Sequence, residues 1–164
     1  MEQTIAAQAR GAARDAAPGV PPLPGTSIIL TADGARRMDG LRAGARVITR
    51  DAGMVRLQGI THRRGRPELI RVRAGSLGDA RPDRDTLLPA DQPVLLRDWR
   101  ASALFGARQA VVPLRRLVDG EFVAHATPAE IALCTLDFAG PHILYVNGME
   151  LASVAPAQAW HNAA

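Results

Sequence analysis

The chain has 164 residues, which is enough for one folded domain with flanking segments. Hydrophobic residues make up 47% and aromatic residues only 4%, so a globular core must be built from aliphatic side chains. One cysteine excludes an internal disulfide framework, and one cysteine with four histidines argues against a structural zinc site. No apolar run reaches the roughly 18 residues of a membrane helix. We expect no metal, no cofactor and no membrane contact.

The formal net charge is +4, and every basic residue is arginine. Nucleic-acid binders usually cluster this charge on one element and interleave it with aromatic side chains. Here arginine is spread along the chain and aromatic residues are scarce. The pattern argues against a nucleic-acid partner and leaves a protein partner open.

Residues 1–20 are predicted to form a flexible or short helical arm. The arm is followed by the proline-rich segment Pro18–Pro24. This segment is interpreted as an extended linker because proline fixes φ and removes backbone donors. The arm lacks the apolar core of about 7–15 residues that a signal peptide needs. We therefore expect a cytoplasmic protein, with export by a non-classical route left open. Residues 21–154 are predicted to be the domain, and residues 155–164 a tail.

From Gly25 onward, short apolar or alternating runs rich in Val, Ile, Leu and Thr predict strands. The expected strands are Ser27–Thr31, Arg46–Arg50, Met54–His62, Glu68–Arg73, Pro93–Arg97, Ala110–Leu114, Glu121–Ala126, Ile131–Phe138 and His142–Val146. Turn signals recur at Ala32-Asp33-Gly34, Asp51-Ala52-Gly53, Asp119-Gly120 and Asn147-Gly148. Short helices are expected only around Arg100–Phe105 and Ala155–Trp160. The pattern is typical of an all-β domain with many hairpins.

Several motifs occur in a familiar order. Pro24-Gly25-Thr26 precedes an apolar strand, and the segment GLRAGARVITRD at 40–51 follows it. Next come IRVRAGSLG at 70–78 and VPLRRLVDG at 112–120. Together they resemble the Hint fold, the self-processing module of Hedgehog proteins and inteins, and most of all its bacterial branch, common in alphaproteobacteria. The resemblance covers about four fifths of the chain and implies a horseshoe-like, pseudo-twofold all-β domain.

The resemblance also implies a chemistry, an N-to-S or N-to-O acyl shift at the first residue of the domain. The shift needs a nucleophile and a histidine that acts on the scissile amide. The family's nucleophilic cysteine corresponds to Pro21, and its histidine corresponds to Gln92. Both groups are missing, so we expect a catalytically degenerate domain that acts as a structural or protein-interaction module. The alternative is an active, self-cleaving domain that uses Thr26 or Ser27, although a turn hydroxyl bonded to nearby backbone is the favoured interpretation of both.

Two further positions fall near the processing pocket of the relatives, which carry an Asp and a His in this region. Asp137 and His142 are therefore candidates for a residual polar pocket. The competing interpretation is a loop Asp bonded to backbone and a half-exposed His. Cys134 lies in an apolar run without a basic neighbour in sequence, which favours a small buried hydrophobe over a catalytic thiol.

Three other patterns have simpler interpretations. His161-Asn162 is similar to the pair that ends inteins, but it comes late in the chain and is interpreted as a chance dipeptide in the tail. Arginines interleave the acidic cluster Asp79, Asp83 and Asp85, which favours a self-neutralised loop over a calcium site. Arg63, Arg64 and Arg66 could hold an anionic partner, but a solvated hairpin turn is the favoured interpretation.

Overall fold

The computed structural model describes residues 20–78 and 80–154. The predicted arm lies outside the described residues except for Val20. The same holds for Asp79 and for residues 155–164, which include the expected helix Ala155–Trp160 and the dipeptide His161-Asn162.

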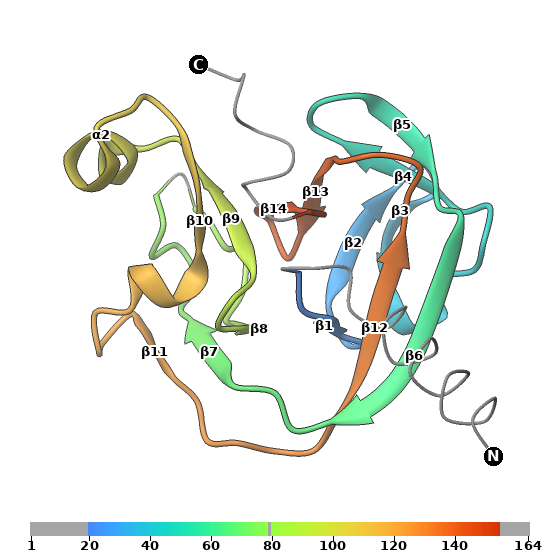
Figure 1. Cartoon of the computed structure of the whole chain (residues 1–164), viewed down its shortest axis with the longest axis horizontal. Coiled ribbons are helices and arrows are strands. Elements are labelled where there is room, and N and C mark those ends of the chain that lie inside the picture. Colours follow the sequence, from blue (N-terminus) through green and yellow to red (C-terminus); the bar gives the residue numbers. More distant parts are fainter. Residues whose placement is uncertain (1–19, 79, 155–164) are drawn as a thin grey trace, which may run out of the picture.

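Short strands dominate the described part of the chain (Figure 1). They are β1 (Leu23–Pro24), β2 (Ile28–Thr31), β3 (Gly34–Arg37), β4 (Arg46–Thr49), β5 (Gly53–Arg56), β6 (Gly59–Gly65), β7 (Leu69–Val72), β8 (Thr86–Pro89), β9 (Pro93–Leu96), β10 (Ala110–Pro113), β11 (Val123–His125), β12 (Ile131–Asp137), β13 (Ile143–Val146) and β14 (Met149–Ala152). Within these residues the only α-helix is α2 (Trp99–Phe105), and two 3-10 turns lie at Met38–Gly40 and Leu114–Leu117. The all-β prediction is confirmed.

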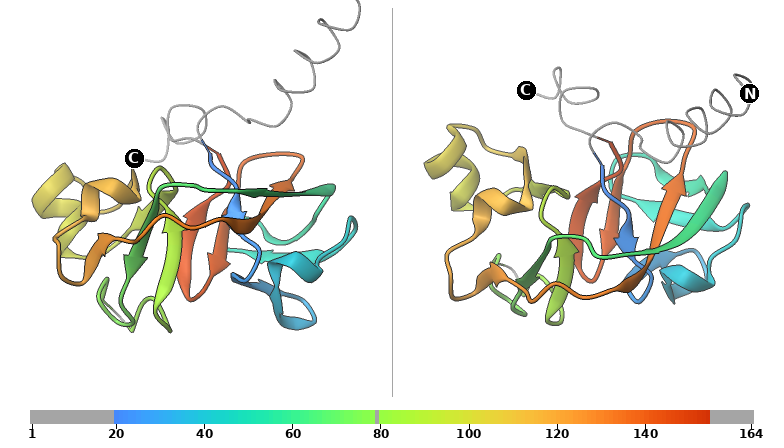
Figure 2. Two further views of the ribbon diagram at one scale, coloured as in Figure 1. Left: turned by 90° about the horizontal axis from the view of Figure 1, so that it is seen from below. Right: turned by 60° about the horizontal axis from the view of Figure 1, so that its bottom comes forward.

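The strands form three antiparallel sheets. The largest has the order β10-β9-β14-β13-β2-β4-β5, with β3 paired to β2. Two three-stranded sheets, β1-β12-β6 and β11-β7-β8, complete the fold. Figure 1 shows a horseshoe of two lobes, with β13 and β14 between them, and Figure 2 shows the same arrangement from two other sides. Strands from the first and last thirds of the chain thus lie together at the centre.

Three of the four predicted turn signals lie at hairpins, which join β2 to β3, β4 to β5 and β13 to β14, whereas Asp119-Gly120 lies in the turn before β11, which pairs with β7. Asn147 and Gly148 have φ values of 50° and 76° and join β13 to β14, where Val146 pairs with Met149. Two consecutive residues with positive φ are typical of the tight turn that matches the twist of paired strands. Asp119 accepts backbone N–H bonds from residues 121, 122 and 123 at 2.8, 2.8 and 3.0 Å, which explains the turn before β11.

The expected strand Met54–His62 is in fact two strands, β5 and β6, separated by Leu57 and Gln58. Leu57 N donates to Ala45 O, whereas Gln58 N donates to Asp137 O. The backbone therefore changes partner between these residues, from the side of β4 to β12. The single-strand prediction was wrong because apolar and polar residues alternate through Val55, Arg56, Leu57 and Gln58, so the sequence does not mark the change of partner.

The hairpin turn predicted at Arg63, Arg64 and Arg66 was also wrong. Arg63 and Arg64 lie within β6, opposite Leu133 and Ala132 of β12. The β6–β12 pairing extends over seven residue pairs, and it joins segments that are about seventy positions apart, so local sequence could not reveal it.

The core is aliphatic, as the composition predicts. Fully buried side chains come from both lobes and from the central strands, among them Ile29, Val47, Leu88, Leu114 and Leu151. Each buried aliphatic side chain of this size contributes about 1.5–3 kcal/mol to folding. Among the described residues, no helix is long and apolar enough to cross a membrane.

Candidate functional site

Pro21 and Gln92, the two positions that the resemblance singles out, line the same cavity. Pro21 lies two residues before the start of the short strand β1, whose Leu23 pairs with Cys134 of β12. Gln92 follows the turn after β8, where its N–H donates to Pro89 O. The cavity measures about 40 Å³, and the described residues that line it are all uncharged: Val20, Pro21, Leu23, Gln92, Cys134, Thr135, Leu136, Leu144, Leu151, Ala152 and Ser153. We call it the Pro21–Gln92 cavity.

The side chain of Gln92 is 1% exposed and is held at one end only. Its Nε2 donates to Pro93 O at 2.9 Å and to Ala152 O at 3.1 Å. Its Oε1 is buried and accepts no hydrogen bond from the described residues. Turning the amide over would press Oε1 against two carbonyl oxygens, so the orientation is fixed. An unsatisfied buried acceptor costs about 1–3 kcal/mol, which makes Oε1 unusual in a folded core.

Thr26 and Ser27 line a different cavity. It measures about 270 Å³, and its other lining residues are Ile28, Arg37, Arg84, Asp85, Thr86, Leu87 and Asn147. Thr26 is exposed and Ser27 is buried. Neither belongs to the lining of the Pro21–Gln92 cavity.

Cys134 contacts a histidine that sequence reasoning missed. Cys134 Sγ lies 3.4 Å from His62 Nδ1, because the two residues face each other across β12 and β6. Burial, and then the negative charge of Asp39, raise the pKa of the thiol. Cys134 is 1% exposed, so the pair is a buried thiol beside an imidazole rather than a reactive thiolate.

Asp137 and His142 do not meet in the Pro21–Gln92 cavity. Asp137 is exposed at the end of β12, and its backbone pairs with Gly59. His142 Nδ1 instead lies 3.0 Å from Asp51 Oδ2, and Asp51 Oδ1 accepts the N–H of Ile143 at 2.8 Å. His142 thus belongs to a polar contact between β13 and the turn after β4.

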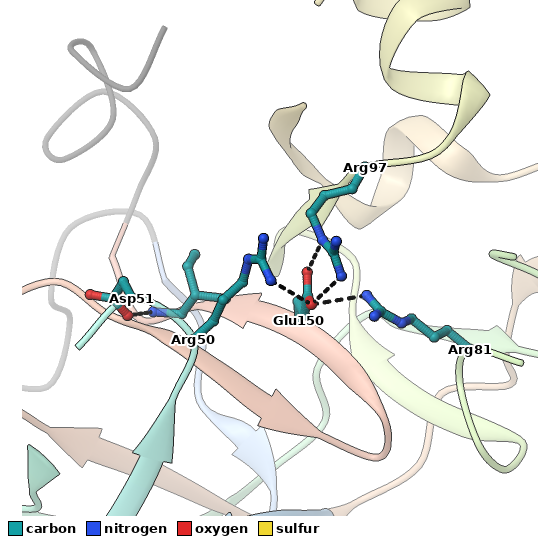
Figure 3. A network of polar contacts seen from close by, with 6 residues as sticks. Arg50, Asp51, Arg81, Arg97 and Glu150 are labelled. Carbon is teal, nitrogen blue, oxygen red and sulfur yellow. Dashed lines mark hydrogen bonds and ion pairs between the residues drawn. The ribbon is translucent and has the colours of Figure 1, made fainter. Parts of the chain in front are cut away.

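A second group of charges, absent from the sequence-based candidates, surrounds Glu150 of β14 (Figure 3). Its side chain is 1% exposed, and its Oε1 lies 2.9 Å from Arg81 and 3.7 Å from Arg50. Arg97 contacts both carboxylate oxygens. Burial acts to raise the pKa of Glu150, but hydrogen bonding by Arg97 and the charges of Arg81, Arg97 and Arg50 outweigh it, so the pKa lies below its ordinary value. These four residues, the Glu150 cluster, join β14 to three separate loops.

The carboxylates of Asp83 and Asp85, the described members of the acidic cluster, bind neighbouring protein groups. Asp83 pairs with Arg84 at 2.9 Å, and Asp85 accepts the N–H of Ala74 at 2.9 Å. Residues 20–78 and 80–154 contain no group of three or more His, Cys, Asp or Glu side chains placed to hold a metal ion.

A family model of the Hint domain matches residues 23–158. The match spans well over half of the chain, and the chain therefore belongs to the Hint domain family.

Solved intein structures share this fold. The crystal structure of the gp41-1 intein has 10% sequence identity and a TM-score of 0.50, with 79% of this chain and 96% of that chain covered. The crystal structure of a variant of the MchDnaB-1 intein has 15% identity and a TM-score of 0.50, covering 81% and 99%. At such identities the likeness shows the fold alone. No curated protein matches the chain.

Proposed function

We propose that the chain is a catalytically degenerate Hint domain that does not cleave itself and acts as a structural or protein-interaction module. The observation that carries this proposal is the shared cavity of Pro21 and Gln92. The family's nucleophile and histidine belong at these two positions, and here neither residue supplies the needed group. The alternative is an active domain in which Thr26 or Ser27 attacks.

The chemistry at Pro21 supports inertness. An acyl shift needs a side-chain heteroatom that attacks the preceding carbonyl, and the proline ring carries none. Cys134 also lines the cavity, but burial raises the pKa of its thiol and leaves it in the less nucleophilic, protonated form. Thr26 and Ser27 line a different cavity, away from Gln92.

The chemistry at Gln92 supports the same conclusion. A carboxamide neither takes up nor releases a proton near neutral pH, so Gln92 cannot act as the general acid or base that a histidine provides. Such a group typically contributes about 10²–10⁴-fold in rate. The Nε2 of Gln92 also donates both of its hydrogens to backbone carbonyls, so the side chain has no donor left for a scissile amide.

Intact-mass spectrometry tests the proposal. The full chain, with a folded domain fused before Met1, is incubated with hydroxylamine or a thiol and followed over time. We expect the fusion to keep its full mass. A fragment beginning between Pro21 and Ser27 would contradict the proposal. The matched variants Thr26→Ala, Ser27→Ala and Cys134→Ala would then show which side chain attacks.

A further inference from the structure

We propose that the Glu150 cluster binds a phosphate group as its dianion, either free phosphate or the end group of a phosphate monoester. The inference goes beyond the proposed function and does not depend on it. The cluster and the Pro21–Gln92 cavity lie at opposite ends of β9, because Arg97 directly follows this strand and Gln92 directly precedes it. Three properties of the cluster carry the inference: its net charge, the cleft beside it and the donors that Glu150 leaves unused.

The cluster carries an excess of positive charge. Arg97 Nη2, Arg81 Nη1 and Arg50 Nη1 lie 2.6, 2.9 and 3.7 Å from Glu150 Oε1. Because the pKa of Glu150 lies below its ordinary value, the carboxyl is ionised at neutral pH. Three guanidinium groups and one carboxylate leave a net charge of +2. Like charges this close together repel each other, and a further anion would relieve that repulsion.

A cleft lies beside the cluster, and the charged residues of its lining are Arg81, Arg97, Asp98 and Glu150. Asp98 does not offset the excess charge, because Arg100 already pairs with it: Arg100 Nη1 lies 2.5 Å from Asp98 Oδ2. The other described residues of the lining are apolar. An anion in this cleft would therefore lie beside two of the three arginines that share Glu150.

Arg81 has the donors that such an anion needs. A guanidinium group carries five N–H donors, and Arg81 contacts Glu150 through Nη1. Its side chain has no other acceptor among the described residues, so the edge formed by Nε and Nη2 is unused. Arg97 holds the Glu150 carboxylate with the corresponding edge, which shows the two-point contact that this geometry permits (Figure 3). The Arg81 side chain is 32% exposed, so a ligand from solvent can reach it.

A phosphate dianion fits these properties better than a carboxylate does. Two of its oxygens can accept the two donors of one guanidinium edge. Its charge of about −2 near neutral pH balances the excess of the cluster, whereas a carboxylate balances only half of it. We therefore expect the affinity of the site to follow the charge of the anion.

Three probes test the charge and the source of the ligand: inorganic phosphate, methyl phosphate and acetate. The full chain, labelled with ¹⁵N, is titrated with each probe and followed by NMR at constant ionic strength, because added salt alone would screen the arginines. Methyl phosphate has one oxygen esterified, so it stands for a phosphate at the end of a larger molecule.

We expect phosphate to shift the amide signals of Arg81 and Arg97 until they saturate, and to leave that of Arg64 in β6 unchanged. Phosphate should bind about threefold or more tightly than acetate, which is the effect of one more partly exposed ion pair. Methyl phosphate as strong as phosphate would support a monoester as the ligand, and weaker methyl phosphate would support the free ion.

Two matched variants locate the site. Arg81→Gln should weaken phosphate binding about tenfold, the lower end of what a hydrogen bond to a charged group contributes. Arg84→Gln removes the same charge three positions further along the loop, from a guanidinium that pairs with Asp83. It should change the affinity less than about twofold.

Shifts that do not saturate, acetate binding as tightly as phosphate, or equal losses of affinity in Arg81→Gln and Arg84→Gln would overturn the inference. If Arg81→Gln fails to fold, Arg50→Gln takes its place, because Arg50 lies farther from Glu150 and contributes mainly charge. It should weaken phosphate binding about threefold, and an unchanged affinity would overturn the inference. The comparison of phosphate with acetate needs no variant.

Discussion

Arg97 binds both carboxylate oxygens of Glu150. Its Nε lies 2.8 Å from Oε2 and its Nη2 lies 2.6 Å from Oε1. Such a two-point contact fixes direction as well as distance. Arg97 follows β9 and Glu150 lies in β14, so the pair adds a side-chain contact between the central strands and the lobe that carries α2 (Figure 1).

Glu150→Gln should destabilise the fold strongly. Three guanidinium groups would lose the buried carboxylate that they share. Breaking a fully buried pair costs about 3–5 kcal/mol. We expect about 2–3 kcal/mol here, because the arginine side chains are about a third exposed and water screens their charge. Urea unfolding measures the change. The control Glu68→Gln removes a half-exposed partner of Arg115 and should cost less than about 1 kcal/mol. Similar losses in both variants would contradict the prediction.

The contribution of Glu150 should depend on pH with a defined sign. Folding lowers the pKa of this carboxyl from its ordinary 4.5. The unfolded chain therefore takes up the proton first as the pH falls. The stabilisation is complete well above pH 4.5 and is lost as the pH falls through the lower pKa of the folded state. Unfolding free energies of the wild type and Glu150→Gln should differ by a constant amount near neutral pH and converge in acid. Divergence toward low pH would mean that the sign is wrong.

Gly148→Ala and Gly120→Ala form a matched pair. Both glycines have positive φ, 76° and 82°. A Cβ at Gly148 would lie 2.9 Å from the backbone nitrogen of Asp83, whereas a Cβ at Gly120 would meet nothing within 4 Å. Gly120→Ala should cost about 1–2 kcal/mol from the left-handed backbone alone. Gly148→Ala should destabilise the fold clearly more than Gly120→Ala, because the backbone nitrogen of Asp83 cannot move aside as a flexible side chain could. Equal melting temperatures in the two variants would contradict the steric argument.

Cys134 should resist thiol reagents in the folded protein. It is 1% exposed, and burial raises the pKa of its thiol, so little thiolate forms near neutral pH. We expect Ellman's reagent to react at least about 100-fold more slowly than with the urea-unfolded chain, since reaction must await local opening. Cys134 is the single cysteine, so the signal has no background. Comparable rates in the two states would show that the site is open.

Much of the fold followed from local signals. Asn147-Gly148 and Asp119-Gly120 mark turns because few residues tolerate the backbone that these positions need. The resemblance also led to Pro21 and Gln92, which line one cavity although they are about seventy residues apart.

Contacts that depend on strand register could not be predicted. His62 and Cys134 meet only because β6 and β12 pair in one alignment, which is set by long-range packing. Glu150 escaped notice for a related reason. All four residues of β14 are buried, so this strand shows no alternation of apolar and polar residues. The arginines that pair with the Glu150 carboxylate lie in three loops that are distant in sequence.

The Pro21–Gln92 cavity has residues from both ends of the domain in its wall, Val20 and Pro21 from the beginning and Ala152 and Ser153 from the end. The polypeptide therefore enters and leaves the domain at nearly the same point in space. The two ends of the domain, where the flanking segments attach, are therefore close together in space. The domain is therefore suited to insertion into a surface loop of another protein, because closely spaced ends would displace the two flanking parts of that protein only slightly.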